Sequence, residues 1–135
     1  MPSPANEHAT RLTVRYGETD QMGFVHHSAY VLYLEAARVE HLKALGLPYH
    51  DLEAEGVLLP VIELHINYFK PARFGQEITV ISRFCPVRGV RLKVEYEISA
   101  GDERLVTGHT DHAFMGRNGR PLRPPEHVTA RLPRI

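Results

Sequence analysis

One aspartate stands in a setting suited to acyl-transfer chemistry. Asp20 lies in a turn-like stretch, residues 17–27, in which Gly17 and Gly23 permit tight backbone geometry. A helix is predicted directly after this stretch, and its first turn carries unpaired amides and the positive end of the helix dipole. A carboxylate beside such amides could attack a carbonyl group, or activate water, while the amides stabilise the developing negative charge. Asp20 is therefore a candidate catalytic residue, although the local pattern by itself is more typical of the alternative. The alternative is a turn residue whose carboxylate bonds its own backbone.

Two histidines, His26 and His27, precede the predicted helix. An imidazole titrates near neutral pH and can protonate a leaving group, so His27 is a candidate acid, with a purely positional role as the alternative. Adjacent side chains point in different directions and no third ligand is evident beside them. We therefore expect no metal ion at this pair.

Two further pairs of polar residues have mainly structural interpretations. Glu35 interrupts the apolar half of the predicted helix three residues before Arg38, and we expect a buried ion pair between them. Glu63 and His65 project from the polar side of a predicted strand. We expect solvated side chains there, with a pocket or an interface as the alternative.

A set of basic residues falls at predicted strand ends and in a turn over residues 86–89. Each alone is typical of ordinary surface charge, whereas together they suit a ligand that carries phosphate groups. The set consists of Lys70, Arg73, Arg88, Arg91 and Lys93.

The helix that positions Asp20 and His27 has clear ends in the sequence. Ser28 is suited to begin a helix over residues 29–45, and Gly46 and Pro48 are suited to end it. The first half is apolar almost all round, which is typical of a helix buried by a sheet. The second half is more polar, and we expect it to be exposed.

Strands are predicted on both sides of this helix. Apolar and polar side chains alternate over residues 11–16, which predicts a half-buried strand, and the same period of two returns after residue 59. One strand, one long helix and then four strands joined by short turns predict an α+β fold. We expect an antiparallel sheet of about five strands packed on the helix. The later strands are predicted over residues 62–69, 77–85, 90–99 and 104–115.

Length and composition limit the function classes. The chain has 135 residues, room for one domain, which we predict over residues 1–135 with irregular ends at about 1–10 and 117–135. The 16 basic and 16 acidic residues balance, which excludes the basic footprint of a nucleic-acid-binding protein. The single Cys85 cannot form an intramolecular disulfide, and no apolar run resembles a signal peptide or reaches bilayer length. We expect a cytoplasmic protein without membrane insertion.

Three blocks of the chain form a distinctive set. They are RYGETDQMGFVHHSAY at residues 15–30, YLEAARVE at residues 33–40 and YFKPARFG at residues 68–75. In their order and on the expected elements, these blocks resemble the 4-hydroxybenzoyl-CoA thioesterase family, and the resemblance covers nearly the whole chain. Short bacterial acyl-CoA thioesterases associated with the Tol-Pal system are similar as well.

The resemblance implies a hotdog fold, an antiparallel sheet curled around the long central helix. It also implies hydrolysis of acyl-CoA thioesters at sites between subunits, without a metal or other cofactor. Asp20 would be the nucleophile or the general base, and the backbone amide of His27 would contribute to the oxyanion site. We further assign substrate contacts to Gly23, Val25, Tyr30, Lys70, Arg88 and Arg91.

The resemblance also bears on assembly. Its subunits pair edge to edge into dimers that often form tetramers. The predicted elements also favour an oligomer, because one helix cannot cover both faces of a five-stranded sheet in so short a chain. We therefore expect apolar surface and a strand edge to be buried between copies, in a dimer or a tetramer.

Two alternatives remain at this stage. One is a hotdog hydratase or dehydratase, which would need a differently placed histidine with a carboxylate. The other is a non-catalytic hotdog module that binds acyl groups or scaffolds a partner. The aspartate-bearing turn disfavours both. His26 and Ala29 stand where family members commonly carry tyrosine and asparagine, so the resemblance does not specify which acyl group is the substrate.

Overall fold

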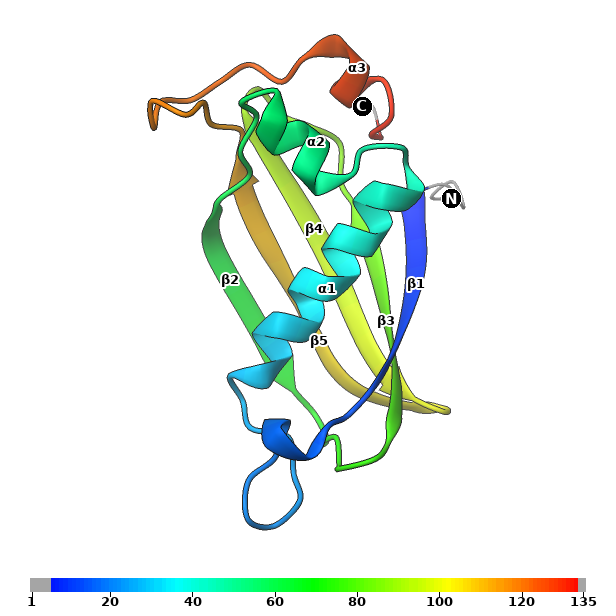
Figure 1. Ribbon diagram of the computed structural model, residues 1–135. Helices are drawn as coiled ribbons and strands as arrows, with labels where there is room; N and C mark the ends of the chain where they lie inside the picture. The colour runs from blue at the N-terminus through cyan, green and yellow to red at the C-terminus, as the bar shows by residue number, and fades with distance from the viewer. Residues whose placement is uncertain (1–5, 134–135) are drawn as a thin grey trace.

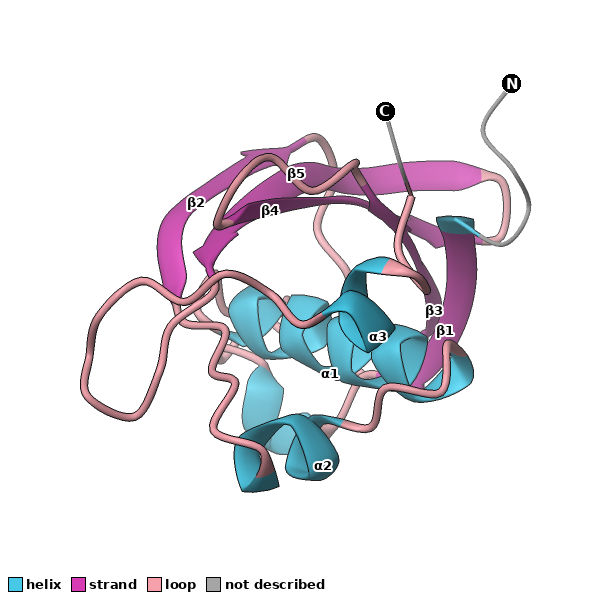
Figure 2. Ribbon diagram, turned by 90° about the horizontal axis from the view of Figure 1, so that it is seen from above, coloured by secondary structure: helices cyan, strands magenta, loops and turns pink. Residues whose placement is uncertain are grey.

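A five-stranded antiparallel sheet curls around one long helix in the computed structural model, which describes residues 6–133 (Figures 1 and 2). The helix, α1 (Ala29–Ala44), lies in the concave face of the sheet. The strand order is β1-β3-β4-β5-β2. This is the α+β arrangement expected from the sequence. The strands are β1 (Glu7–Thr13), β2 (Val61–Tyr68), β3 (Glu77–Phe84), β4 (Arg91–Ala100) and β5 (Glu103–Ala113).

The three central strands form a meander whose side chains alternate between the two faces. In β4, Leu92, Val94 and Ile98 are buried toward α1, while every second residue is exposed on the outer face. The β4–β5 turn contains Gly101 with φ of 59°. A residue with a Cβ rarely adopts this conformation, so glycine suits the tight turn.

The structure confirms the predicted limits of α1 but not its predicted burial. It begins after Ser28 and ends before Gly46, whose φ is 79°. Ser28 makes no capping bond with its side chain, because its Oγ lies 2.8 Å from Nδ1 of His26. Val31 and Leu32 are 39% and 58% exposed. The expectation of burial all round was wrong because the sheet covers only one side of the helix.

The second half of α1 also differs from expectation. His41 is buried, with Nδ1 2.9 Å from Oγ of Ser82 on β3. Glu35 is exposed and forms no ion pair with Arg38 in the described part of the chain. Instead, Nη1 of Arg38 donates to the Tyr96 hydroxyl at 3.1 Å. The helix twist turns Arg38 toward the sheet and Glu35 toward solvent, so the predicted buried pair is wrong.

The terminal segments are more ordered than predicted. β1 starts at Glu7 because residues 7–13 pair with residues 77–83 of β3. The strand ends at Thr13, so Tyr16 lies in a short 3-10 helix, η2 (Tyr16–Glu18), and is 76% exposed. Near the C-terminus, α3 (Glu126–Thr129) places Val128 in the core. Residues 1–5 and 134–135 of the predicted irregular ends lie outside the described residues.

Another short helix, α2 (Tyr49–Ala54), follows Pro48 and buries Leu52. The sequence pattern did not predict it. Both α2 and α3 are too short to show a clear period, and each is held by one or two buried side chains. No helix within residues 6–133 is long and apolar enough to cross a bilayer.

Strand β2 forms one edge of the sheet and exposes apolar side chains. Ile62, Leu64 and Tyr68 are 45%, 42% and 50% exposed. Leu64 and Tyr68 pair with Thr110 and Val106 of β5 and therefore share the face that bears α1. The start of α1 reaches Tyr68, whose ring centroid lies 5.2 Å from that of Tyr30, but both side chains stay partly exposed.

Candidate active site

The aspartate-bearing stretch forms a small hairpin at the end of the molecule where α1 begins (Figure 1). The His26 amide donates to the Glu18 carbonyl at 2.8 Å, and the Asp20 amide donates to the Phe24 carbonyl at 2.8 Å. Gly23, with φ of 81°, permits the tight turn at the tip. Asp20 therefore lies near the tip of this hairpin, and His27 follows its base.

The Asp20 carboxylate is exposed and partly engaged within its own hairpin. Oδ1 accepts hydrogen bonds from the amides of Met22 and Phe24 at 2.8 and 3.2 Å. This is the turn-stabilising arrangement considered as the alternative to a catalytic role. The second oxygen, Oδ2, has no hydrogen-bond partner among residues 6–133. One oxygen is thus held by the backbone, and the other is available to a reactant.

Glu18 anchors the hairpin to α1, a role that the sequence did not reveal. Its Oε1 accepts from the Tyr33 hydroxyl and from the Arg15 amide, each at 2.8 Å. Burial disfavours ionisation of Glu18, but these hydrogen bonds outweigh it and lower the pKa of the carboxyl group below its usual value. The same burial and the Glu18 carboxylate raise the pKa of Tyr33. Glu18 and Tyr33 lie in two of the three sequence blocks quoted above, and this position was the sequence feature that could have pointed to their role.

The start of α1 leaves a backbone donor unpaired. The amides of His26 and Ala29 donate to Glu18 O and His26 O at 2.8 and 2.9 Å. Between them, the His27 amide donates no hydrogen bond to any residue in the described range 6–133. An unpaired amide at the positive end of a helix favours an anionic ligand atom.

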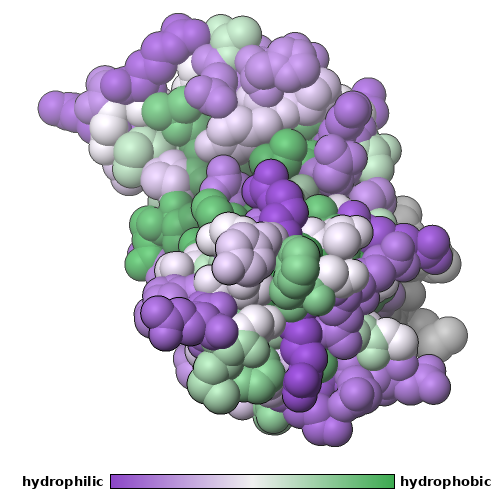
Figure 3. Space-filling view, turned by 60° about the horizontal axis from the view of Figure 1, so that its bottom comes forward, coloured by the Kyte–Doolittle hydropathy of each residue, from purple (hydrophilic) through white to green (hydrophobic). Residues whose placement is uncertain are grey.

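A cleft of about 310 Å³ opens beside this end of α1. Tyr30 and Tyr68 meet edge to face inside it, with ring centroids 5.2 Å apart, and the Tyr30 hydroxyl accepts from the Ala72 amide at 3.1 Å. A space-filling view of this end shows apolar surface interspersed with polar side chains (Figure 3). Such a lining suits an apolar or aromatic group. The lining residues are Val25, His27, Tyr30, Tyr68, Phe69, Lys70 and Pro71.

Four of the predicted site residues thus meet in one cleft: Val25, His27, Tyr30 and Lys70. Asp20 and Gly23 lie in the adjoining hairpin and do not line the cleft within one chain. The Lys70 ammonium is paired with the Glu103 carboxylate at 2.6 Å, although both side chains are more than half exposed. A phosphate group would compete with that surface carboxylate.

The other predicted phosphate contacts lie at the far end of the sheet. Arg88 and Arg91 exchange backbone hydrogen bonds in the β3–β4 turn. The amide of Lys70 bonds to the Leu105 carbonyl, near the β4–β5 turn. Successive turns of an antiparallel meander fall at opposite ends of the strands. Within one chain, the basic residues therefore do not form one group.

The remaining residues weighed from the sequence lie away from the cleft. Glu63 and His65 are on β2, on the outer face of the sheet. Cys85 is half-buried, and this burial raises the pKa of its thiol, which disfavours a reactive thiolate.

Comparisons with known proteins concern the chain as a whole. Residues 14–132 match the sequence model of the thioesterase-like superfamily. The putative acyl-CoA thioesterase YneP of Bacillus subtilis is 39% identical over 87 residues. The match covers 64% of this chain and 63% of YneP, less than two thirds of the length of that protein.

Solved structures are similar over most of the chain. A hypothetical protein from Thermus thermophilus superposes with a TM-score of 0.87 and 44% identity, covering 93% of this chain and 94% of that one. The DHNA-CoA thioesterase from Staphylococcus aureus superposes with a TM-score of 0.83 and 30% identity, covering 87% and 80%. Together with the superfamily match, these similarities confirm the hotdog fold expected from the sequence.

Proposed function

Because the chain belongs to the thioesterase-like superfamily, we propose that it is a thioester hydrolase that converts acyl-CoA to a free acid and coenzyme A. The observation that carries this proposal is the unpaired His27 amide at the start of α1. It lies beside an aromatic cleft and follows a hairpin whose Asp20 keeps one oxygen free. A thioester needs a donor to its carbonyl oxygen, an apolar site for the acyl chain and a nucleophile or base.

In the proposed reaction, the thioester carbonyl oxygen accepts a hydrogen bond from the His27 amide. Negative charge develops on that oxygen as the carbonyl carbon is attacked, and the amide and the helix dipole stabilise it. Asp20 either attacks the carbon, giving an acyl-enzyme that water then hydrolyses, or removes a proton from the attacking water. The carbon–sulfur bond breaks, and coenzyme A leaves as a thiolate that takes a proton. A thiolate leaves readily, so the His27 side chain serves mainly to position substrate.

We propose that the site is completed between two copies of the chain. The β2 edge carries unpaired backbone groups and the exposed side chains of Ile62, Leu64 and Tyr68, which supports pairing with a second β2. A two-fold axis reverses the sheet direction, so the β3–β4 turn of one copy would lie toward the α1 start of the other. Arg88 and Arg91 would then serve the phosphates of coenzyme A in the partner's site, in a dimer or a tetramer of such dimers.

The thioesterase type and the substrate contacts can be proposed from the residues of this site. The three sequence blocks favour the 4-hydroxybenzoyl-CoA thioesterase type, including its Tol-Pal-associated members, with Gly23 and Val25 near the substrate. Tyr30 and Tyr68 in the cleft would contact the acyl group. We propose one thioesterase domain over residues 1–135. A coenzyme A substrate and the lone Cys85 support a cytoplasmic location.

The test is release of free thiol from a panel of aromatic and aliphatic acyl-CoAs, each compared with its acyl-pantetheine. Turnover of at least one acyl-CoA is expected, with weaker binding of the truncated substrate because it lacks the phosphates. Absence of thiol release from the whole panel would refute the proposed activity. Equal kinetics on acyl-CoA and acyl-pantetheine would refute the phosphate contacts alone.

A further inference from the structure

Three potential metal ligands converge on the outer face of the sheet, away from α1 and the cleft. Nε2 of His109 lies 3.6 Å from Oε2 of Glu63 and 3.8 Å from Oδ2 of Asp111. One ligand atom from each residue lies within 4.8 Å of the other two. The proposed catalytic site uses none of these residues.

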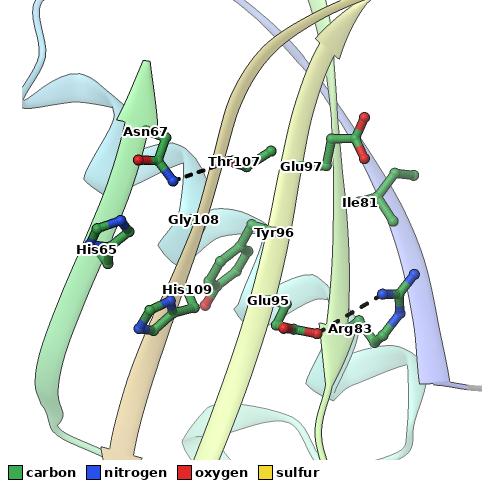
Figure 4. A pocket seen from close by; sticks show the side chains of 10 residues that line it. All are labelled: His65, Asn67, Ile81, Arg83, Glu95, Tyr96, Glu97, Thr107, Gly108 and His109. Carbon is green, nitrogen blue, oxygen red and sulfur yellow. Dashed lines mark hydrogen bonds and ion pairs between the residues drawn. The ribbon is translucent and has the colours of Figure 1, made fainter. Parts of the chain in front are cut away.

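The strand register explains why these residues meet. Glu63 and His65 of β2 pair directly with Asp111 and His109 of β5. Residues two apart in a strand share a face, so all four side chains project from the same side of the sheet. The rings of His65 and His109 stack with centroids 5.4 Å apart and an interplanar angle of 14°. Figure 4 shows these two rings side by side on neighbouring strands.

The distances suit a tetrahedral cation. Two ligand atoms that each lie about 2.0–2.2 Å from a zinc ion at the tetrahedral angle are roughly 3.4 Å apart. The two separations from His109 exceed this value by only a few tenths of an ångström. The third, between the two carboxylates, is within 4.8 Å and would shorten on binding. The side chains of His109 and Asp111 are 27% and 25% exposed, so the sheet holds them. Glu63, at 65%, is free to adjust.

The local charge also favours a cation. Glu63 and Asp111 place two carboxylates around one imidazole. The neighbouring strand adds Lys93 opposite Asp111 and Glu95 opposite His109. Glu95 also lies 4.0 Å from the Arg83 guanidinium. Arg83 thus balances the charge of Glu95, and the Lys93 ammonium group is left beside the two carboxylates that flank His109. A divalent ion would offset the mutual repulsion of these two carboxylates.

We propose that Glu63, His109 and Asp111 form a binding site for a divalent transition-metal cation, with Zn²⁺ as the best match. One imidazole and two carboxylates are ordinary zinc ligands, and water would complete the tetrahedron. The ion would join edge strand β2 to β5 on the face opposite the cleft. Its role is structural, so the inference is independent of the proposed hydrolysis.

The test uses the whole protein after removal of metal with a chelator. Zn²⁺ is titrated in competition with a chromophoric chelator at about pH 7.5, and the stoichiometry and affinity are recorded. His109→Ala and Asp111→Asn should each lose one equivalent of zinc, or bind it at least 10-fold more weakly. Zn²⁺ should also raise the thermal midpoint of the unmodified protein and not that of either variant.

Two controls address the other histidines. His127→Ala removes a surface imidazole that lies 3.0 Å from a Glu55 carboxylate oxygen, a similar contact outside the cluster. His26→Ala tests the His26–His27 pair, whose rings lie 4.3 Å apart. Both variants should keep the equivalent that His109→Ala loses.

The outcomes are distinct. Loss of the same equivalent in both cluster variants, with retention in both controls, supports the site. No zinc binding by the unmodified protein overturns it, as does unchanged binding in the folded cluster variants. If circular dichroism shows that His109→Ala is unfolded, Asp111→Asn decides alone, because it preserves side-chain shape.

Discussion

Acid should destabilise this protein through one buried histidine, His112. Its Nδ1 lies 3.0 Å from the Leu59 carbonyl oxygen and its Nε2 lies 2.8 Å from Oγ1 of Thr110. A carbonyl oxygen only accepts, so Nδ1 carries the proton and Nε2 accepts from the Thr110 hydroxyl. The neutral ring therefore satisfies both of its neighbours.

The hydrogen bonds beyond Thr110 depend on this protonation state. Oγ1 of Thr110 lies 2.7 Å from the Tyr96 hydroxyl, which accepts from Nη1 of Arg38 at 3.1 Å. Because Thr110 donates to His112, Tyr96 must donate to Thr110. A second proton on His112 would remove the acceptor at the end of this chain. It would also bury a cation close to another cation, Arg38.

The size of the effect follows from the pKa. Burial, together with the charge of Arg38, lowers the pKa of His112 from 6.5 to about 4. Below pH 6.5 the unfolded chain takes up a proton at this residue and the folded chain does not, so stability falls as pH falls. The slope approaches about 1.4 kcal/mol per pH unit and levels off below about pH 4. The total loss from His112 is therefore about 3 kcal/mol.

The assay is urea unfolding followed by circular dichroism at several pH values between about 7.5 and 4.5. His112→Gln keeps a donor and an acceptor but does not titrate. Over this range its free energy of unfolding should therefore fall by about 2 to 3 kcal/mol less than that of the unmodified protein. His127→Gln, which changes an exposed histidine, should decline as the unmodified protein does. Equal pH dependence of His112→Gln and the unmodified protein would refute the reasoning.

Four further predictions concern the proposed reaction and assembly. Asp20→Asn should lower thiol release on the order of 10²-fold or more without loss of folding by circular dichroism, whereas near-normal turnover would exclude Asp20 as the catalytic group. His27→Ala should have a milder effect in the same assay, because the oxyanion donor is its backbone amide. Neutralising Arg88 and Arg91 together should raise KM for acyl-CoA more than it lowers kcat, and an unchanged KM would contradict their phosphate role. Light scattering should find a dimer or tetramer at micromolar concentration, with Leu64→Lys shifting it toward monomer; a stable unmodified monomer would rule out the intersubunit site.

Local patterns in the sequence determined the types and limits of most elements. The alternation through Leu92, Val94 and Ile98 predicted both β4 and its buried face, because side chains along a strand alternate between the two faces. Ser28 and Gly46 marked the ends of α1, because helix limits depend on residues next to them in sequence. The pattern around Asp20 likewise predicted a turn-like stretch before the helix start, and the structure shows that this stretch is a hairpin.

Only the tertiary structure decided which of these elements meet. β1 reaches back to Glu7 because β3, far away in the sequence, pairs with it, as Glu7 with Arg83 shows. His41 is buried because β3 passes beneath it. Arg88 lies apart from Lys70 because the meander sends successive turns to opposite ends. The cluster around His109 likewise depends on the β2–β5 register. A short-range pattern specifies the face on which a side chain lies, whereas its neighbours depend on which distant strand completes the backbone hydrogen bonds.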